Sequence, residues 1–436
     1  MTLGALAAQR RLGVVSAHLN GGGGNAKLVV VLPDGGKITV IDVPSTLDSQ
    51  STPIQAGTSP TMDRRRILSL NGAQIASFVI LQERKVAFDA VALGTRYQGV
   101  TKHIPKYNVV KIESFVDEGD YGKVWAWVYG LVMLHHEQEH IPILFERGST
   151  VPLYLLESGI GKVYPTFGVS KRILESVEDL VFLSRSAFWQ GAGTTGWHGS
   201  GWILDPRREP FPAQRAYTRN DRVIAAHPLR PPKPKQGTTL YRRWCGSVKR
   251  TLEITYFDLG DGNIQTSRHM AAFHKWHNDE RVNSAWGERG SLETHREYVE
   301  TVLEDPNVWP CMLSWDGELM GYVEIVWAKE NHVGQHYPNG VVVGDWERGI
   351  HVLAGESKFV GSGMSETWIR SLVHYIYLAD PRTERVIGEP DCTNKAILAV
   401  AKNSGFHTQT FFDFPYKKSA MVLNVRDSFF TQCRLY

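Results

Sequence analysis

Short apolar runs separated by polar turns fill the C-terminal half of the chain, and most have the length of single strands. Met364, Trp368, Leu372 and Ile376 are spaced four apart and predict one face of a long helix, which Pro381 ends. The helices are expected at 363–378, around 274–282, from Ser291 to Leu303, and from a Thr393 cap to about Asn403. The strands are expected at Thr251–Phe257, Trp309–Trp315, Leu319–Trp327, around His351, Arg385–Gly388, Gln409–Phe414 and Ala420–Val425.

The N-terminal half gives fewer signals. Leu28–Leu32 and Ile38–Val43 flank a Pro-Asp-Gly-Gly turn and predict a hairpin, and Ser176–Gln190 has helical spacing. The proline-rich segment 227–237 favours extended chain, so a domain boundary is expected near it. We predict a flexible or targeting segment at 1–24, an N-terminal α/β domain at 25–190, a Gly/Pro-rich linker at 191–238 and a second domain at 239–436.

Composition narrows the classes of protein to consider. A length of 436 residues exceeds one typical core, so two domains are expected. The net charge of +3 is small and disfavours a nucleic-acid partner. No apolar run approaches the about 20 residues of a membrane span, so no membrane partner is expected. The four cysteines are far apart, which indicates a reducing compartment without a disulfide framework or a zinc knuckle.

One motif suggests a metal. His136-Glu137-Gln138-Glu139-His140 matches the H-E-x-x-H pattern of zinc peptidases, in which both histidines must lie on one unbroken helix. Pro142 disfavours a helix at 141, so we expect a solvated helix end here and no bound metal. A zinc peptidase that uses His136 and His140 stays as an alternative.

The segment 348–363 carries the clearest chemistry. An apolar run that contains His351 leads into a loop with the spacing Lys358-x-x-Gly361-x-Gly363, and a long helix follows. A strand, a glycine loop and a helix N-terminus together favour binding of a phosphate, because backbone N–H groups and the helix dipole both attract an anion. The loop is neither a Walker loop nor a dinucleotide-binding G-x-G-x-x-G motif.

The element order and this loop resemble the GCN5-related N-acetyltransferase superfamily, whose loop cradles the pyrophosphate of coenzyme A; Lys358 stands where Arg or Gln is usual. Six spaced motifs over about residues 240–430 narrow the resemblance to the siderophore-biosynthesis N-acyltransferases, which include fungal hydroxyornithine transacylases and bacterial hydroxylysine acetyltransferases. These motifs are Phe273–Val282 with Trp286, Gly321–Trp327, Arg348–His351, Asp380–Thr383, Glu389–Asn394 and Phe412–Lys418.

The resemblance implies an α+β fold with a mixed central sheet flanked by helices, and a degenerate acyltransferase-like N-terminal domain without a second active site. It implies acyl-coenzyme A as a co-substrate, with no permanently bound cofactor. The implied coenzyme A-binding residues are Val352, Leu353, Lys358, Phe359, Val360, Gly361, Ser362, Gly363, Met364 and Asn394. The implied substrate-binding residues are His274, Trp276, Asn278, Arg281, Trp327 and Asp391, with core packing as the competing interpretation for Trp276 and Trp327.

His351 and Glu389 are the implied catalytic pair. Acyl transfer to nitrogen requires an unprotonated nitrogen and a base that removes its remaining proton. The nitrogen of a hydroxylamine is weakly basic and is already neutral near pH 7, so a histidine is a sufficient base. Glu389 ends the strand after that of His351, and it would orient the imidazole or bind the substrate ammonium. A backbone N–H near Val352–Ala354 would hold the oxyanion.

The N-terminus indicates a location. Arg11-Leu12 and His18-Leu19 match the R-L-x5-H-L pattern of the N-terminal peroxisomal signal, which implies an import receptor as a partner. In fungi, transfer of anhydromevalonyl groups in siderophore synthesis is peroxisomal, which favours an N5-hydroxyornithine anhydromevalonyl transferase. The alternatives are cytoplasmic acetyl transfer to hydroxyornithine or N6-hydroxylysine, and a scaffold that only binds coenzyme A. The family's edge strands also allow a homodimer.

Overall fold

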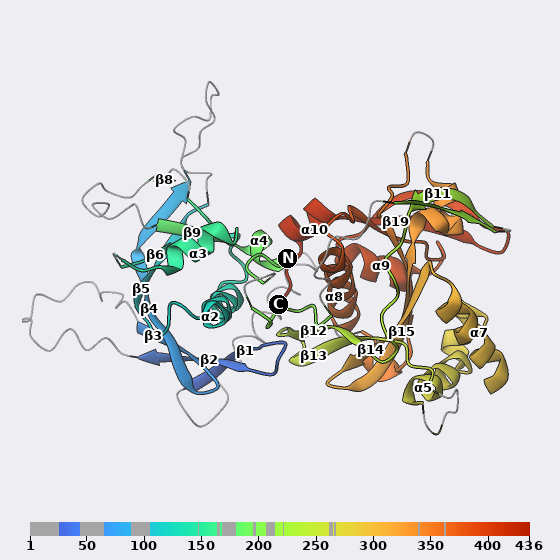
Figure 1. The fold of residues 1–436 in the computed structure, drawn as a ribbon, viewed down its shortest axis with the longest axis horizontal. Helices are drawn as coiled ribbons and strands as arrows, with labels where there is room; N and C mark the ends of the chain where they lie inside the picture. The colour runs from blue at the N-terminus through green and yellow to red at the C-terminus, as the bar shows by residue number, and fades with distance from the viewer. Residues whose placement is uncertain are drawn as a thin grey trace, which may run out of the picture. The chain divides into compact units, whose positions relative to one another are not determined.

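The chain forms two compact units, Met1–Gly201 with Tyr436, and Trp202–Leu435 (Figure 1). The computed structural model describes residues 26–43, 65–88, 105–146, 148–163, 166–167, 180–194, 198–205, 214–220, 222–260, 265, 267–338, 341–361 and 363–436. The peroxisomal pattern at Arg11–Leu19 and the loop residue Ser362 lie outside these ranges. The two units meet in sequence at Gly201–Trp202, within the segment expected to be a linker.

The second unit is built on an eight-stranded sheet with the order β12-β13-β14-β15-β16-β17-β19-β18. All neighbours are antiparallel except β16 and β17, which are parallel. The strands are β12 (Thr239–Cys245), β13 (Arg250–Tyr256), β14 (Val308–Trp315), β15 (Glu318–Trp327), β16 (Arg348–Ala354), β17 (Arg385–Gly388), β18 (His407–Asp413) and β19 (Lys418–Val425).

Helices cover both faces of this sheet. They are α5 (Arg268–His277), α6 (Glu280–Trp286), α7 (Leu292–Glu304), α8 (Met364–Ala379), α9 (Lys395–Asn403) and α10 (Arg426–Gln432). Met312, Tyr322 and Leu353 pack with α5–α7 in one core cluster. Tyr241 of β12 pairs in the sheet with Ile254 and bonds His374 of α8 at 2.8 Å, on the other face. The sheet is therefore buried between α5–α7 and α8, as Figure 1 shows.

Local sequence explains most element ends in this unit. Asp316 and Gly317, with φ of 50° and 81°, form the tight turn between β14 and β15, as predicted. Ser291 caps α7 by accepting a hydrogen bond from the N–H of Thr294. The predicted strands and helices of this unit are all present, including the helix that Pro381 follows.

Three expectations for this unit need correction. The helix expected around 274–282 is two helices, because Asp279 accepts from the N–H of Arg281 and starts α6. Asn394, and not Thr393, caps α9, since the Thr393 hydroxyl instead donates to Asp391. Strand β12 and helix α10 were not predicted.

The first unit repeats the strand order of the second. Its sheet runs β1-β2-β3-β4-β5-β6-β9-β7, with the short β8 paired to β4, and here β5 and β6 form the parallel pair. The strands are β1 (Ala26–Val31), β2 (Lys37–Val43), β3 (Arg65–Leu70), β4 (Ala73–Phe88), β5 (Tyr107–Phe115), β6 (His140–Leu144), β7 (Gly161–Lys162), β8 (Thr166–Phe167) and β9 (Leu180–Ser184). The acyltransferase-like architecture expected for this half is therefore confirmed.

Helix α2 (Tyr121–Leu134) joins β5 to β6, as α8 joins β16 to β17. The other helices among the described residues of this unit are α3 (Val151–Glu157) and α4 (Arg185–Trp189). The helix expected over Ser176–Gln190 is wrong at Leu180–Ser184, where buried residues form β9, and is confirmed at Arg185–Trp189, which form α4. Apolar spacing cannot separate such a short buried strand from a helix. Among the described residues, no helix is long and apolar enough to cross a membrane.

Candidate active site

Three neighbouring strands place three titratable side chains in one row. Glu324 of β15 pairs directly with His351 of β16 in the antiparallel ladder. The parallel register of β16 and β17 pairs Arg348 with Val386 and Gly349 with Ile387. Continuing this register two residues further brings Glu389, just after β17, opposite His351.

The imidazole of His351 lies between the two carboxylates. Its Nδ1 is 2.9 Å from Glu324 Oε2, and its Nε2 is 3.2 Å from Glu389 Oε1. The ring is a quarter exposed, whereas the two carboxylates are almost fully buried. The predicted pair of His351 and Glu389 is thus in contact, and Glu324 is an additional partner.

The charges in this row act on each other. Burial alone would lower the pKa of His351, but the hydrogen bonds and charges of Glu324 and Glu389 outweigh burial and raise it well above the ordinary value. Burial raises the pKa of Glu389, and the contacts with His351 and Lys417 more than reverse that effect. His351 is therefore cationic at neutral pH in the free protein.

Glu389 has a second cationic neighbour. Lys417 donates to Glu389 Oε2 at 2.5 Å and to its backbone carbonyl at 2.9 Å. These bonds hold one carboxylate oxygen and leave Oε1 facing His351. The site thus pairs two carboxylates with an imidazolium and an ammonium, which compensates the charge of the buried groups.

Strands β16 and β17 separate beside His351 and Glu389. Strand β16 pairs with β17 only at Arg348 and Gly349, and from Ile350 to Ala354 that edge has no partner among the described strands. Gly355 N–H donates to Met320 on β15, so the alternation of the ladder turns the backbone groups of Val352 and Ala354 toward the open edge. This is where the predicted oxyanion donor lies.

The glycine loop has the expected open backbone. Gly361 and Gly363 have φ of 82° and 78°, and no described atom lies within 4 Å of a Cβ built on either. Phe359 is buried, Val360 is exposed and Met364 begins α8. Lys358 forms an ion pair with Glu318 at the surface. The loop therefore offers backbone to a ligand, while its lysine is engaged within the protein.

Helices α5 and α6 hold the chain between β16 and this loop. The indole N–H of Trp276 donates to Glu356 at 2.9 Å, Lys275 bonds the same oxygen at 2.5 Å, and Arg281 donates to the carbonyl of Gly355 at 2.7 Å. A Cβ on Gly355 would lie 2.1 Å from the Trp276 ring, so only glycine fits there. Trp276 and Arg281, predicted for the acceptor, thus contact the β16–α8 connection.

His274 and Asn278 contact α7 and the chain just before it. His274 Nδ1 lies 2.8 Å from His295 Nδ1 of α7. Asn278 donates to the carbonyl of Gly290 at 3.1 Å and accepts from the Gly290 N–H at 3.3 Å. Both side chains therefore bind the α6–α7 segment, and their contact with a substrate stays a prediction.

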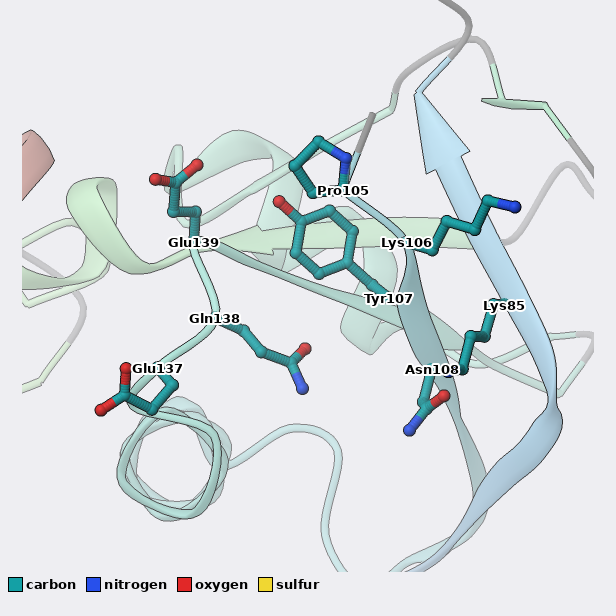
Figure 2. A pocket seen from close by; sticks show the side chains of 8 residues that line it. All are labelled: Lys85, Pro105, Lys106, Tyr107, Asn108, Glu137, Gln138 and Glu139. Carbon is teal, nitrogen blue, oxygen red and sulfur yellow. The ribbon is translucent and has the colours of Figure 1, made fainter. Parts of the chain in front are cut away.

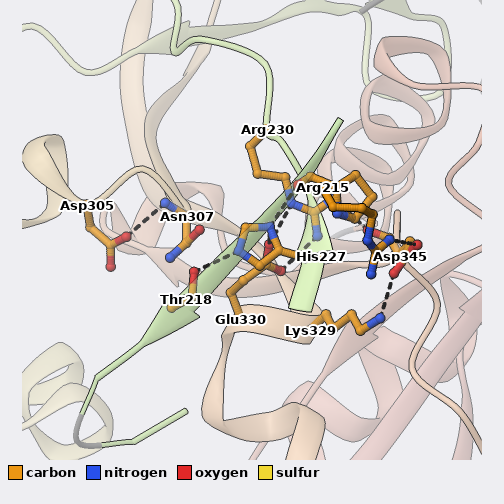
Figure 3. Close-up of polar contacts among 10 residues, drawn as sticks. Arg215, Thr218, His227, Arg230, Asp305, Asn307, Lys329, Glu330 and Asp345 are labelled. Carbon is orange, nitrogen blue, oxygen red and sulfur yellow. Dashed lines mark hydrogen bonds and ion pairs between the residues drawn. The ribbon is translucent and has the colours of Figure 1, made fainter. Parts of the chain in front are cut away.

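Trp327 lies in a buried stack of cations and rings. The guanidinium carbons of Arg230 and Arg348 lie 4.1 Å and 3.7 Å from the centre of a Trp327 ring. Glu330 is fully buried and accepts from Arg230 at 2.6 and 2.8 Å. Figure 3 shows Arg230 and His227 converging on Glu330, with Arg215 and Lys329 beside Asp345. Packing, the competing interpretation for Trp327, accounts for its contacts here.

This stack anchors the hairpin of β10 (Arg215–Arg219) and β11 (Ile224–Pro228) to the turn η2 (Ala328–Glu330). Such a buried pair is costly to break on one side, because the remaining charge loses its partner. The next turn, η3 (His332–His336), is thereby held beside the β18–β19 connection, where His332 contacts Phe414 with ring centres 4.9 Å apart.

Asp391 and Asn394 have local roles in the structure. Asp391 accepts from the N–H and hydroxyl of Thr393 at 2.7 and 2.6 Å, and these bonds lower the pKa of Asp391. Asn394 accepts from the N–H of Ile397 at 3.1 Å and caps α9. Both side chains are engaged near Glu389, and no contact with a ligand is established for either.

The first unit lacks this chemistry at the matching positions. Its parallel register pairs Lys111 with Leu144, which places Glu113 and Glu146 where the second unit has His351 and Glu389. Glu113 forms an ion pair with Arg65. The chain before α2 carries Asp117, Glu118 and Asp120, and Asp120 itself caps the helix. This acidic segment repels a phosphate where the second unit has its glycine loop.

A cavity of about 340 Å³ does lie in the first unit. Figure 2 shows the chain at 137–139 opposite Lys85 and the chain at 105–108, with the Gln138 side chain pointing toward Asn108. Apart from Lys85 of β4, these residues precede or begin β5 and β6, whereas His351 lies in the middle of β16 and Glu389 follows the end of β17. The cavity is therefore not a second copy of the site.

The structure does not fit the zinc-peptidase interpretation, because the two histidines of the motif do not lie on one helix. Helix α2 ends at Leu134, before His136, and His140 begins strand β6. The two histidines therefore do not share a helix face, as the motif requires. Within the described ranges, no group of three or more His, Cys, Asp or Glu side chains could hold a metal ion.

Sequence reasoning missed Glu324, Tyr298, Tyr322 and Lys417. Glu324 was the one detectable case, because it is a carboxylate inside the otherwise apolar run Leu319–Trp327, a position that requires a partner. Tyr298 and Lys417 reach the site from a helix and a loop, and only tertiary structure brings them there.

Residues 265–414 match a family model described as an acetyltransferase (GNAT) domain. The chain is 34% identical over 324 residues to a hydroxyornithine transacylase of Ajellomyces capsulatus, which covers 71% of this chain and 72% of that protein. It is 36% identical over 272 residues to an N(5)-hydroxyornithine:cis-anhydromevalonyl coenzyme A-N(5)-transacylase of Beauveria bassiana, with 58% of each covered.

A third relative is the N(6)-hydroxylysine O-acetyltransferase of Escherichia coli, 34% identical over 260 residues, or 58% of this chain and 73% of that one. The family match covers the strands and helices that carry His351, the glycine loop and Glu389. The chain therefore belongs to the siderophore-biosynthesis N-acyltransferase family of the GCN5-related N-acetyltransferase superfamily, and it is an acyltransferase.

Proposed function

We propose that the protein transfers an acyl group from acyl-coenzyme A to the hydroxylated side-chain nitrogen of N5-hydroxyornithine, with anhydromevalonyl as the acyl group. One observation carries the chemistry: an imidazole held between two carboxylates beside an opened parallel strand pair. The transacylases of Ajellomyces and Beauveria support the choice of acceptor, and the Beauveria relative supports the choice of acyl group.

In this proposal the reaction is a direct attack without an acyl-enzyme. The hydroxylamine nitrogen forms a C–N bond with the thioester carbonyl, and the C–S bond breaks to release the thiolate of coenzyme A. The nitrogen's proton passes to Nε2 of a neutral His351, and the thiolate takes up a proton to leave as the thiol. Glu389 stabilises the imidazolium that forms.

The co-substrate would lie along the open edge of β16. The backbone of Val352–Ala354 would face the thioester and hold the oxyanion. The phosphates would lie at Gly361–Gly363 and the start of α8, where the backbone faces open space. Lys358 would exchange its surface partner Glu318 for a phosphate.

The acceptor would enter from the side of Glu389 and η3. His332 feels the charges of Glu389 and His351, and burial lowers its pKa. Its Nε2 is buried and makes no hydrogen bond to the described residues. A neutral imidazole there could bond the hydroxyl group of the acceptor, next to Phe414.

The test is a coenzyme A-release assay with a panel of substrates. Hydroxyornithine, hydroxylysine and ornithine would each be combined with anhydromevalonyl-coenzyme A and acetyl-coenzyme A. We expect the highest kcat/KM for hydroxyornithine with the anhydromevalonyl donor and no turnover of ornithine. Binding of coenzyme A without turnover of any pair would instead indicate a scaffold, and a preference for hydroxylysine with acetyl donor would favour the activity of the Escherichia relative.

We also propose import into peroxisomes through the pattern at Arg11–Leu19. A fluorescent protein fused behind residues 1–24 should reach peroxisomes, and changing Arg11 and His18 to alanine should leave it in the cytoplasm. A cytoplasmic wild-type fusion would reject this proposal without affecting the catalytic one.

A further inference from the structure

We propose that Glu324 is a positioning residue for His351: it holds the imidazole with Nδ1 as the hydrogen-bond donor, so that Nε2 is the only ring atom able to accept a proton from the acceptor. This inference rests on the proposed function for the identity of the acceptor. Its geometric part stands on contacts within the protein alone.

The sheet fixes the position of Glu324. This glutamate lies directly opposite His351 in the β15–β16 ladder, and Nδ1 and Oε2 are 2.9 Å apart. The backbone pairing therefore fixes this contact, which does not depend on a mobile loop. Glu389, in contrast, follows the end of a strand and lies 3.2 Å from Nε2.

The second carboxylate oxygen of Glu324, Oε1, is also hydrogen-bonded. Glu324 Oε1 accepts from the hydroxyl of Tyr298 at 2.6 Å and from that of Tyr322 at 2.9 Å. Burial raises the pKa of both tyrosines, so both are hydroxyl donors. Burial raises the pKa of Glu324, but the hydrogen bonds and charge of His351 and the bonds from the two tyrosines more than reverse that effect, so the carboxylate is ionised.

The ionised carboxylate of Glu324 determines which nitrogen of His351 carries a proton. Because Glu324 is acceptor-only, His351 Nδ1 must carry a proton in every protonation state of the ring that keeps the contact. When the ring is neutral, its lone pair is therefore on Nε2, which faces Glu389 and the open edge of β16. This is the orientation that a base for the acceptor nitrogen requires.

Several other groups face this pair and enter any test of its titration. These groups belong to several elements packed against Glu324 and His351. They are Tyr322 on β15, Tyr298 on α7, His277 on α5, His332 on η3, and Glu389 with Lys417 beside β17 and β19. Of the residues that the structure describes, only Glu324 bonds Nδ1, so its removal has a distinct effect on the ring.

The central variant is Glu324→Gln. Its amide can accept from the tyrosines only by turning its NH2 toward Nδ1, where two donors oppose each other. If it turns the other way, its carbonyl accepts from Nδ1 and the two tyrosine hydroxyls can no longer donate to it. Either arrangement removes the negative charge. We expect kcat/KM to fall roughly tenfold to a hundredfold, less than the 10²- to 10⁴-fold that loss of the base itself causes.

The decisive readout needs no substrate. The full chain, labelled at histidine, would be titrated by NMR, and the His351→Gln variant would identify the signal of His351. We expect the midpoint of His351 to lie lower in Glu324→Gln than in the wild type and to return toward the wild-type value in Glu324→Asp. Tyr298→Phe, which removes a donor from Glu324 and keeps the carboxylate, should raise the midpoint and covers the case in which Glu324→Gln does not fold.

Glu347→Gln is the matched control. Glu347 is also a buried glutamate bonded by a tyrosine, Tyr337 at 2.8 Å, but it pairs with Arg385 and does not contact His351. It should leave the midpoint of His351 unchanged. An unchanged midpoint and kcat/KM in Glu324→Gln would overturn the proposal. A shifted midpoint in a protein that does not use hydroxyornithine would leave the role of Glu324 intact and reject only the proposed acceptor.

Discussion

At the scale of single residues, the site is a histidine whose two nitrogens are both engaged by carboxylates. In the free protein Glu324 and Glu389 raise the pKa of His351, so the ring is charged when no substrate is bound. An imidazole must be neutral to accept a proton, because the imidazolium carries a proton on both nitrogens. The protein is therefore expected to use only the neutral fraction of His351, with an acceptor that needs no deprotonation before it attacks.

This arrangement predicts the pH dependence of kcat/KM, which reports the free enzyme. Activity should rise with pH through a midpoint above about 6.5, the ordinary value for histidine, because deprotonation of His351 produces the base. In Glu389→Gln one negative neighbour is lost, so the midpoint should move to lower pH while the maximal rate falls. Rate measurements from pH 5 to 10 would check this, and a profile that falls across the same range would contradict it.

Residue-scale prediction from the sequence was uneven for a physical reason. The contact between His351 and Glu389 was predictable, because a motif and the order of two neighbouring parallel strands both point to it. The contacts of Trp276 and Arg281 with the chain between β16 and α8 were not predicted. A sequence motif does not reveal whether a side chain faces the substrate or binds a neighbouring loop. Ser362 lies outside the described residues.

At the scale of elements, the site depends on how β16 passes into α8. The strand leaves its parallel partner after Gly349, and Trp276, Lys275 and Arg281 hold the following chain. Gly361 and Gly363 then take left-handed conformations, and α8 begins. The elements on both sides of this turn were predictable from apolar spacing, whereas the clamp from α5 and α6 joins residues far apart in sequence.

Gly363→Val tests the loop at this scale. A β-branched residue at φ of 78° is strained by roughly 1–2 kcal/mol and would close the open space beside the backbone. KM for acyl-coenzyme A should rise about tenfold, the factor that 1.4 kcal/mol represents, with a smaller change in kcat. Steady-state kinetics with varied donor would measure this.

Gly159→Val is the control for strain alone. Gly159 has φ of 77°, faces open space and lies in the first unit. It should lose a similar amount of stability and keep the donor KM of the wild type. Equal effects of both variants on KM would mean that the loop does not contact the co-substrate.

At the scale of the whole molecule, two units share one strand order but not one chemistry. The first unit has carboxylates at the positions that match His351 and Glu389, and an acidic segment before its helix α2. Apolar patterning revealed its first hairpin but not its β9, because that strand is buried on both faces. The repeated architecture becomes visible only when the strand order of both sheets is known.

The two units predict a binding stoichiometry. Coenzyme A should bind once per chain, in the second unit, because the acidic segment with Asp117 and Glu118 repels phosphate. Isothermal titration calorimetry would measure the number of sites. Gly363→Val should weaken the single site, and a second site of comparable affinity that survives this change would contradict the assignment.

The role of His351 is tested most directly by comparing hydroxamate formation by the wild type and by His351→Gln, under saturating donor and with binding of coenzyme A measured on the same samples. His351→Gln should bind coenzyme A as the wild type does and form hydroxamate 10²- to 10⁴-fold more slowly, the usual contribution of a general base. Hydroxamate formation by His351→Gln at the wild-type rate would contradict this role.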